Sequence, residues 1–279
     1  FYKKFFSSNL VRILLCFLLI LFLTKFSRLA EYGSDLSGQI IISYYIFFIA
    51  ELIFNKDISF EKKILYLKVS LILIVFAISF KFILVIYSIL ILLLLYFINE
   101  KKRVILNLFN YKFLLAIFLP SLFLIFFNFS STGCLLYPVN STCFSNTYDW
   151  AVPSEVVNYL NFYYELWAKA GAGAGYQLSD EKIYVQFLNW VPNWFKMYFF
   201  TKVSDFLLVT LFIIFVFGLF FMKRILEKKK KYTKLDNKHL VFFLSLILIF
   251  LIWFFNFPTL RYAGYIIFYL LIIFPFSVL

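Results

Sequence analysis

The sequence predicts an all-α integral membrane protein with about eight transmembrane helices and one large extracytoplasmic loop. Three observations support this class. Of the 279 residues, 64% are hydrophobic and 15% are charged, whereas soluble domains are about half apolar and a quarter charged. Apolar runs of roughly 20 residues, the length that crosses a bilayer, recur along the chain. Lysine-rich gaps separate many of these runs.

The runs divide the chain into three parts. Five predicted spans fill residues 1–129, a loop fills 130–202, and three more spans fill 203–279. The predicted spans cover residues 9–26, 36–54, 64–79, 82–98, 111–129, 203–222, 239–257 and 261–279. The first is too long for a cleaved signal peptide and lacks a small-residue cleavage site. Because the chain begins at Phe1 and stops inside an apolar run, we expect a fragment truncated at both ends.

Two predicted spans have irregular features. The span at 64–79 is short, and it forms either a tight hairpin with the next span around Ser79-Phe80-Lys81 or a single broken helix pair. Pro120 lies inside the span at 111–129. It should kink that helix, since proline removes a backbone donor and clashes with the preceding turn.

The charges predict the orientation of the chain. With the N-terminus in the cytoplasm, the inner segments hold most of the 27 basic residues, including the cluster from Lys223 to Lys238. Lysine and arginine are enriched in cytoplasmic loops of membrane proteins. This pattern is typical of a multi-pass protein of the bacterial inner membrane, with the 130–202 loop in the periplasm. The run Lys228-Lys229-Lys230-Lys231 then serves as a topology anchor near anionic lipid headgroups.

The net charge of +13 does not indicate a nucleic-acid partner. The many phenylalanines and lysines partly reflect an AT-rich coding bias, and no nucleic-acid-binding motif is present. The expected partner is the lipid bilayer.

Cys134 and Cys143 are the two cysteines of the long loop. A disulfide persists in an oxidising, extracytoplasmic compartment, so the predicted sidedness favours a bridge between them. Two unpaired thiols packed under the loop are the alternative. No metal site is predicted here, because the only histidine, His239, lies on the other side of the membrane.

The segment 28–39 follows the first span and is rich in polar residues. Arg28, Glu31 and Asp35 crowd there against the membrane surface. Such a group could hold a divalent metal, a phosphate through Arg28, or a sugar hydroxyl. The simpler interpretation is a solvated loop with an Arg28–Glu31 pair and a helix capped by Ser34 or Asp35.

Arg261 lies on the near-neutral outer face where the last helix enters lipid. Pro258 sets a turn before it, and the following helix N-terminus offers free amides with a partial positive charge. Arginine beside a helix N-terminus is a good receptor for a phosphate or pyrophosphate. An interfacial arginine that extends its charged group to water is the alternative interpretation.

The remaining features of the loop point to structure more than to chemistry. The glycine-alanine run 170–175 lacks the ending of a phosphate-binding loop and is expected to form a flexible hinge or tip. Trp190 and Trp194 are typical of an interfacial aromatic belt on a helix along the membrane surface. A sugar-binding aromatic platform is the sharper alternative.

Four motifs resemble those of an uncharacterised family of bacterial polytopic inner-membrane proteins. They are Glu31-Tyr32-Gly33-x-Asp35-x-x-Gly38-Gln39, Gly133-Cys134-x-x-Tyr137-Pro138 with Thr142-Cys143-Phe144, Glu165-x-Trp167-Ala168-Lys169, and Pro258-x-x-Arg261-Tyr262. That family is in turn remotely similar to GT-C type glycosyltransferases, which use polyprenyl-phosphate sugars. We refer to the motifs as the first (31–39), second (133–144), third (165–169) and fourth (258–262).

The resemblance implies transfer of a sugar from a polyprenyl-phosphate donor at the periplasmic face. In such enzymes an early outer-loop carboxylate acts as base or metal ligand, and Glu31 and Asp35 are the candidates here. Arg261 and Arg28 would hold the lipid phosphate. The resemblance leaves a divalent metal cofactor open. A polymerase or ligase of surface polysaccharide, and a non-enzymatic transporter or flippase, remain the alternatives.

Overall fold

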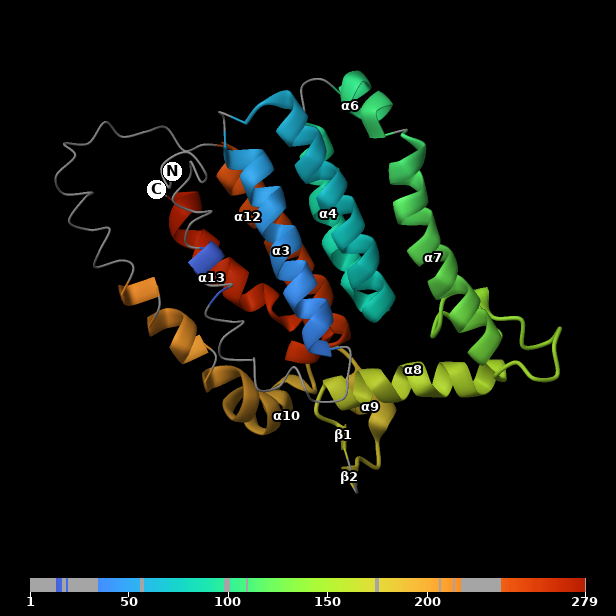
Figure 1. Ribbon diagram of the computed structural model, residues 1–279. Helices are drawn as coiled ribbons and strands as arrows, with labels where there is room; N and C mark the ends of the chain where they lie inside the picture. The colour runs from blue at the N-terminus through green and yellow to red at the C-terminus, as the bar shows by residue number, and fades with distance from the viewer. Residues whose placement is uncertain are drawn as a thin grey trace.

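The computed structural model describes residues 14–16, 19, 35–55, 58–97, 101–108, 110–173, 176–205, 207–212, 214–216 and 237–278. Its long helices stand side by side, and the segment 133–203 covers one end of them (Figure 1). We call this the loop end. The opposite end, where α4 and α6 begin, is called the charged end.

The chain runs back and forth between these two ends (Figure 1). The helices of this part are α3 (Asp35–Phe54), α4 (Phe60–Phe80), the 3₁₀ helix η2 (Phe82–Ser88), α5 (Ile89–Phe97), α6 (Lys101–Leu108), α7 (Tyr111–Thr132), α12 (Asn237–Asn256), the π-helical turn η5 (Leu260–Gly264) and α13 (Ile266–Val278). α3, η2 and α13 begin at the loop end, whereas α4, α7 and α12 end there.

Among the described residues, four helices are long and apolar enough to cross a membrane. They are α3 from Leu36, α4, α7 and α12; a bent pair, Val191–Val203 with Leu207–Val216, raises the number to five. The predicted fourth and eighth spans correspond to the shorter apolar stretches Phe82–Phe97 and Leu260–Ile273. Most of the predicted first span, and the predicted sixth beyond residue 216, lie outside the described residues. The chain is a helical membrane protein.

The span predicted as short at 64–79 is in fact a 21-residue helix, α4. Its first turn contains Glu61, Lys62 and Lys63, which are exposed at the charged end and so add to the helix without entering the core. Lys81 then adopts extended backbone angles, with φ −152° and ψ 117°. Because η2 and α5 return to the charged end, the structure has the hairpin rather than a single broken helix (Figure 1).

α3 forms the centre of the bundle, and α7 forms its margin. About 61% of the α3 span is buried against other elements, compared with 6% for α7. The half-buried and buried residues of α7 recur every three or four positions along the side that packs on α4, while its other sides are apolar and exposed. α7 continues through Pro120 as one helix. In a bilayer, its exposed apolar sides would face lipid.

The segment 133–203 lies across the loop end. α8 (Ser154–Ala168) lies crosswise to α7 and passes beneath α4 and α3 (Figure 1). It is followed by the antiparallel pair β1 (Ala172–Gly173) and β2 (Tyr176–Gln177), then α9 (Glu181–Val185), α10 (Val191–Trp194) and the π-helix η4 (Phe195–Val203). The glycine run contributes β1 to this strand pair, and Gly171 packs closely on Tyr184. Residues 174–175 lie outside the described residues, so the flexible hinge or tip stays a prediction.

The predicted aromatic belt at Trp190 and Trp194 is wrong. Both side chains are buried, with exposed fractions of 0% and 2%, and both pack on Phe254 of α12. The indole of Trp190 donates to the carbonyl of Phe187, and that of Trp194 donates to the carbonyl of Pro258. Since the protein itself satisfies these polar N–H groups, neither ring needs the membrane–water interface.

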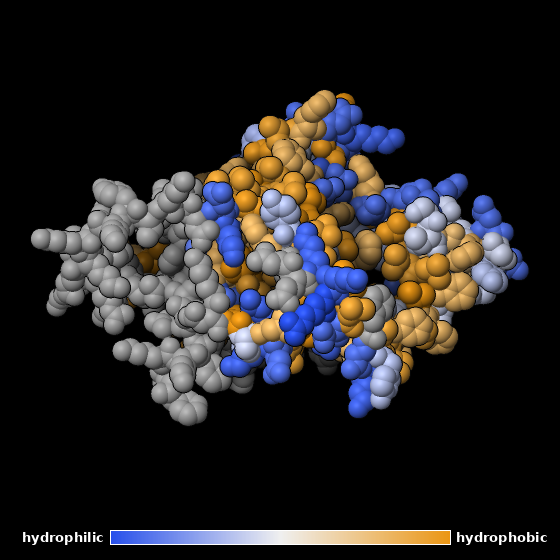
Figure 2. Space-filling view, turned by 90° about the horizontal axis from the view of Figure 1, so that it is seen from above, coloured by the Kyte–Doolittle hydropathy of each residue, from blue (hydrophilic) through white to orange (hydrophobic). Residues whose placement is uncertain are grey.

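The charged end is distinct from the loop end. Exposed basic residues gather at the starts of α4 and α6, where the view onto this end shows hydrophilic side chains among apolar ones (Figure 2). They include Lys62, Lys63, Lys101, Lys102 and Arg103. The segment 133–203 at the loop end contains five acidic residues and four lysines. The basic excess of the described residues therefore lies at the charged end, and which end faces the cytoplasm stays a prediction.

Candidate functional site

Described residues of all four motifs meet at the loop end. The side-chain amide of Gln39, in the first motif, donates to the backbone carbonyl of Leu260 in the fourth, at 3.2 Å. Trp167, in the third motif, lies against Arg261 and Tyr262 of the fourth. Tyr137 and Pro138, in the second motif, line a cavity together with Tyr262. Segments separated by more than 200 residues in sequence thus build one region.

Two basic side chains lie at this meeting point. The Nζ atom of Lys81 is 3.2 Å from the backbone carbonyl oxygen of Arg261, to which it donates, and 4.3 Å from the centre of the Tyr262 ring. The guanidinium carbon of Arg261 lies 5.2 Å from the Trp167 ring. We call Lys81 and Arg261 the cation pair. The two aromatic rings stabilise positive charge through their electron-rich faces.

Burial, and then the nearby charge of Arg261, lowers the pKa of Lys81 from 10.5 to about 7. The ammonium form is disfavoured because it loses water on burial and is repelled by a second cation. Lys81 is therefore close to half-protonated at neutral pH. A bound anion would favour the charged form of Lys81.

This pKa predicts how stability depends on pH. Between about pH 7 and 10, Lys81 is mostly neutral in the folded protein but protonated in the unfolded chain, so unfolding takes up a proton. The free energy of unfolding should therefore rise with pH across that window. In Lys81→Met this contribution should be absent. Melting temperatures in detergent at pH 7 and pH 9.5 measure the difference, with Lys196→Met as the control. An equal rise in Lys81→Met would contradict the prediction.

The backbone around Arg261 differs from the predicted helix N-terminus. Tyr262 and Ala263 have non-helical angles, including φ +69° at Ala263, and regular helix begins only at Ile266. The amides of Leu260 and Tyr262 are already used, because they donate to the Tyr198 hydroxyl and to the carbonyl of Thr259. Arg261 therefore offers its side chain to an anion without the amides of a helix start.

Contacts with neighbouring helices hold this irregular turn in place. The indole of Trp194 donates to Pro258 at 2.6 Å, and that of Trp253 donates to Thr259 at 2.9 Å. The Tyr87 hydroxyl donates to the carbonyl of Ala263 at 2.8 Å. At Gly264 a Cβ atom would lie 2.7 Å from the carbonyl oxygen of Thr259, so only glycine fits without a shift. The position of Arg261 is thus fixed from several sides.

A cavity of about 540 Å³ adjoins the cation pair. Its lining combines Lys81, apolar and aromatic side chains, and three asparagines. The residues are Phe80, Lys81, Phe82, Ile83, Tyr137, Pro138, Val139, Asn140, Ser141, Asn158, Asn161, Tyr164, Phe257 and Tyr262. This size and this mixture of rings with few polar groups are typical of small-molecule sites. None of the described residues that line the cavity is a carboxylate.

The cavity lies between α8 and the loop that follows α7. Asn158, Asn161 and Tyr164 are spaced three residues apart on α8, so they share one face of that helix. Residues 137–141 of the loop also line the cavity, together with residues 80–83, Phe257 and Tyr262. Burial raises the pKa of Tyr137, and Tyr164 raises it further, so the phenol remains a neutral hydrogen-bond donor.

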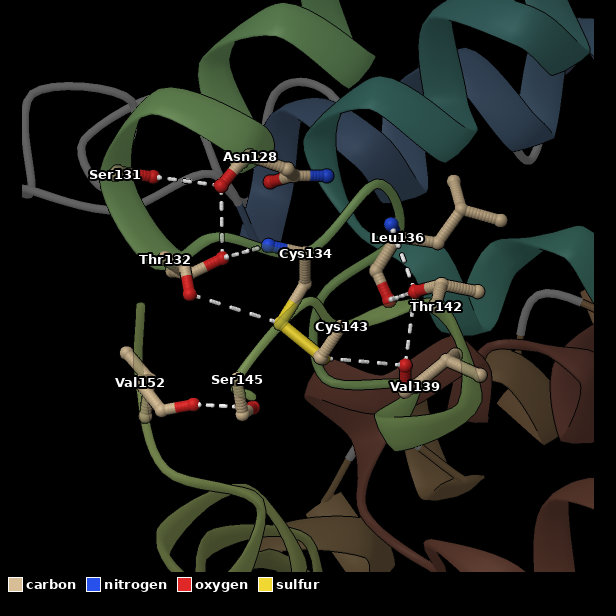
Figure 3. Close-up of a disulfide and its surroundings, with 10 residues drawn as sticks. All are labelled: Asn128, Ser131, Thr132, Cys134, Leu136, Val139, Thr142, Cys143, Ser145 and Val152. Atoms are coloured by element: carbon tan, nitrogen blue, oxygen red, sulfur yellow. Dashed lines mark hydrogen bonds between the residues drawn. A yellow bond between two sulfur atoms is a disulfide. The ribbon is translucent and has the colours of Figure 1, made fainter. Parts of the chain in front are cut away.

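A disulfide closes the loop that supplies this wall (Figure 3). Cys134 and Cys143 are joined with an S–S distance of 2.08 Å, and their backbones form an isolated antiparallel bridge. Inside the loop, the Thr142 hydroxyl accepts the amide of Leu136 at 3.1 Å. Hydrogen bonds within the loop and the bridge together fix the residues that face the cavity.

Removing this bridge should loosen the cavity wall. We expect the double substitution Cys134→Ser with Cys143→Ser to destabilise the loop by about 2 to 4 kcal/mol, since the cross-link limits the freedom of the unfolded loop. Chymotrypsin should then cut faster at Phe144, Tyr148 and Trp150, as mass spectrometry of timed digests would reveal. Cys16→Ser, at a free cysteine, is the control. Identical cleavage rates in all three proteins would refute this expectation.

The charged residues of the third motif have a structural role. Lys169 and Glu165 form an ion pair at 2.5 Å, and the Lys169 ammonium lies 5.4 Å from the Trp190 ring. Lys169 is buried, so its charge requires this partner. The contact of Lys169 with the Trp190 ring links the end of α8 to the segment around Trp190. Trp167 is therefore the residue of this motif that reaches the cation pair.

The sequence model of a family described as "Domain of unknown function (DUF8201)" matches residues 1–268. The chain belongs to this family. The match includes all four motifs, the cation pair and every residue that lines the cavity. No curated protein and no solved structure matches the chain. The resemblance to GT-C type glycosyltransferases stays a prediction.

In this DUF8201 protein the predicted site residues have different outcomes. Arg261 lies at the loop end against Trp167, and the two cysteines are bonded. Asp35 is the first residue of α3, which begins at the same end, but Arg28 and Glu31 lie outside the described residues. Among the described residues, no group of three or more histidine, cysteine or carboxylate side chains is placed to hold a metal.

The sequence alone did not identify Lys81 as a candidate site residue of the DUF8201 chain. Its sequence signal was present, because Lys81 is a lone cation between two apolar runs on the face where basic residues are few. Its neighbour Arg261 is 180 positions away, so their association depends on the fold. Asn158 and Asn161 gave no such signal, since asparagines on an amphipathic surface helix are common.

Proposed function

We propose that this protein binds a polyprenyl-phosphate-linked sugar at the loop end and transfers the sugar to an acceptor. The cation pair beside the cavity carries the proposal. An anionic group and a headgroup would fit there together, because Lys81, the neighbour of Arg261, lines a space of about 540 Å³ with aromatic and amide walls. Arginine and lysine are the side chains that most often bind phosphate.

The level of the site relative to the bilayer suits a lipid-linked substrate. α4 has 21 residues and is about 30 Å long, close to the thickness of the hydrocarbon core of a bilayer. Lys81 follows its last residue and so lies at the level of the headgroups. The apolar residues Phe80, Phe82 and Ile83 line the cavity next to Lys81. A lipid with its tail in the bilayer would therefore present its phosphate to the cation pair.

Two features support an extracytoplasmic position for the site. The disulfide is a bond that persists in oxidising compartments. The exposed lysines and arginines at the starts of α4 and α6 lie at the opposite end, which would face the cytoplasm. In a bacterium, the loop end would thus lie on the periplasmic side of the inner membrane.

The proposed reaction is a direct displacement at the anomeric carbon of the sugar. A carboxylate accepts the proton of the acceptor hydroxyl, whose oxygen forms the new bond to that carbon. The bond from the carbon to the phosphate oxygen breaks, and its electron pair leaves with the lipid phosphate. Lys81 and Arg261 stabilise that negative charge. Glu31 and Asp35 remain our candidates for the base, because α3 begins at Asp35 beside this end.

Photo-crosslinking tests the proposal. The protein in nanodiscs would be irradiated with a polyprenyl-phosphate glucose that carries a benzophenone on its first isoprene unit. We expect labelled peptides from residues 80–83 and 257–262, and competition by the unlabelled lipid. Labelling confined to other segments, or labelling that the unlabelled lipid does not reduce, would overturn the proposal.

A lipid transporter or flippase is the second candidate, and Glu51 favours it. This carboxylate lies inside α3 with an exposed fraction of 2%. Asn55 donates to one oxygen at 2.5 Å, but the other oxygen has no hydrogen-bond partner among the described residues. Buried carboxylates in membrane spans often mark transport pathways. If Glu51→Gln stops the movement of a fluorescent polyprenyl phosphate across liposome membranes that contain the wild-type protein, transport becomes the better explanation.

A further inference from the structure

We infer that the cavity beneath the disulfide loop is a recognition site for one uncharged sugar unit, whose hydroxyls are bound by Asn140, Asn158 and Asn161. This inference rests on the proposed function and adds to it the class of headgroup and the residues that select it. In this arrangement, the cation pair binds the phosphate and the three amides bind the sugar.

The Asn140 side chain gives the first reason. Asn140 lines the cavity, and its Oδ1 atom is buried without a hydrogen-bond partner among the described residues. A buried carbonyl oxygen that accepts no hydrogen bond is costly for the folded protein. A ligand hydroxyl in the cavity would satisfy it. The disulfide loop around Asn140 is fixed by the bond between Cys134 and Cys143, so the acceptor stays in place.

The α8 face gives the second reason. Asn158 and Asn161 line the cavity from α8, and both residues are exposed rather than packed in the core. Each amide provides two donors and one acceptor oxygen, which suits hydroxyl groups that both donate and accept. The nearby rings of Tyr137, Tyr164 and Tyr262 offer flat apolar surfaces for the carbon–hydrogen faces of a sugar.

The charges of the lining define the class of sugar. Lys81 is the one charged residue among the described residues that line the cavity, and it lies at the edge beside Arg261. A positively charged amino sugar would be repelled by these two cations. A uronic acid would compete with the phosphate for them. A neutral hexose meets neither difficulty, so we expect the site to prefer it.

Binding measurements on three short-chain probes test this inference. Farnesyl phosphate, farnesyl-phosphate glucose and farnesyl-phosphate glucuronic acid would be titrated against the full chain in nanodiscs. The double variant Asn158→Ala with Asn161→Ala should still fold, because alanine favours helix at exposed positions. Each lost hydrogen bond should reduce the affinity for the glucosyl probe, farnesyl-phosphate glucose, by roughly two- to twelvefold. Farnesyl phosphate should bind the wild type and the double variant equally, and the wild type should bind glucose better than glucuronic acid. Asn107→Ala, on exposed α6 at the charged end, is the matched control.

The outcomes separate this inference from the proposed function. Selective weakening of the glucosyl probe supports the inference. Equal weakening of the glucosyl probe and farnesyl phosphate, no weakening of either, or a preference for glucuronic acid overturns it, while binding of farnesyl phosphate preserves the phosphate site. If the wild type binds none of the three probes, both the proposed function and the inference fail.

A second measurement isolates Asn140. The glucosyl probe would be compared with analogues that each lack one hydroxyl, against the wild type and Asn140→Ala. One deoxy analogue should bind more weakly than glucose to the wild type and equally to Asn140→Ala, since the partner of that hydroxyl is gone. If Asn140→Ala weakens every analogue by the same factor, Asn140 shapes the loop and does not contact the sugar.

Discussion

Arg261→Ala is expected to abolish sugar transfer while leaving membrane insertion intact. Its guanidinium lies 5.2 Å from the Trp167 ring, and the next residue, Tyr262, lines the cavity. In the proposed reaction it stabilises the charge on the departing phosphate. Loss of one such preorganised donor slows comparable reactions by about 100- to 1,000-fold. Binding of the lipid phosphate should weaken by roughly 10- to 100-fold, as expected for charge-assisted hydrogen bonds.

Transfer would be followed as release of radiolabelled sugar from polyprenyl-phosphate glucose in proteoliposomes, with the benzophenone probe as the measure of binding. Arg103→Ala is a matched control, because Arg103 also stacks on a ring, that of Phe60 at 4.1 Å, but lies in α6 at the charged end. Arg261→Lys should recover part of the activity, since it keeps the charge but loses the planar group. Full transfer by Arg261→Ala would exclude the proposed role.

Trp194→Ala should cause the largest loss of stability among single substitutions in the 133–203 segment. Trp194 is buried against the aromatic rings of Tyr198, Phe199 and Phe254, and its indole donates to Pro258. Removing a buried tryptophan costs about 3 to 5 kcal/mol. Trp194→Phe keeps much of the packing but leaves the buried carbonyl without its donor, which costs about 1 to 3 kcal/mol.

Thermal unfolding in detergent, followed by circular dichroism, would measure these losses. Trp150→Ala is the matched control, because Trp150 is 51% exposed and stacks on Tyr148 at the surface. We expect the order of melting temperatures to be wild type and Trp150→Ala together, then Trp194→Phe, then Trp194→Ala. A melting temperature for Trp194→Ala equal to that of Trp150→Ala would mean that the packing of this segment contributes little to the fold.

Local hydrophobicity was enough to predict the long helices. The predicted spans 36–54, 111–129 and 239–257 end within three residues of α3, α7 and α12, because apolar length decides both where a helix is stable and how far it extends. The start of α4 was placed too late. Its charged first turn carries no hydrophobic signal, yet it continues the helix where the charged end meets water.

The candidate site could be predicted only in part, because it depends on distant contacts. Arg261 was found from its position at a span boundary, and the cysteines from the compartment. The irregular turn around Arg261 could not be predicted, since it is held by Tyr87, Trp194 and Trp253 from other elements. Trp190 and Trp194 were predicted at the membrane–water interface, but contacts with distant elements bury both of them. The α8 residues that line the cavity could not be predicted either, because their position depends on α8 lying across the ends of the other helices.

The fastening of η5 to its neighbours has a consequence for recognition kinetics. The turn that bears Arg261 is fixed by indole and phenol hydrogen bonds, and Lys81 donates to its backbone, so contacts within the protein hold the backbone next to both cations. A phosphate arriving by lateral diffusion in the membrane would meet a preorganised receptor and lose little affinity to ordering of the protein. Capture should then be limited by encounter, and discrimination among lipids should be expressed in how long each one stays.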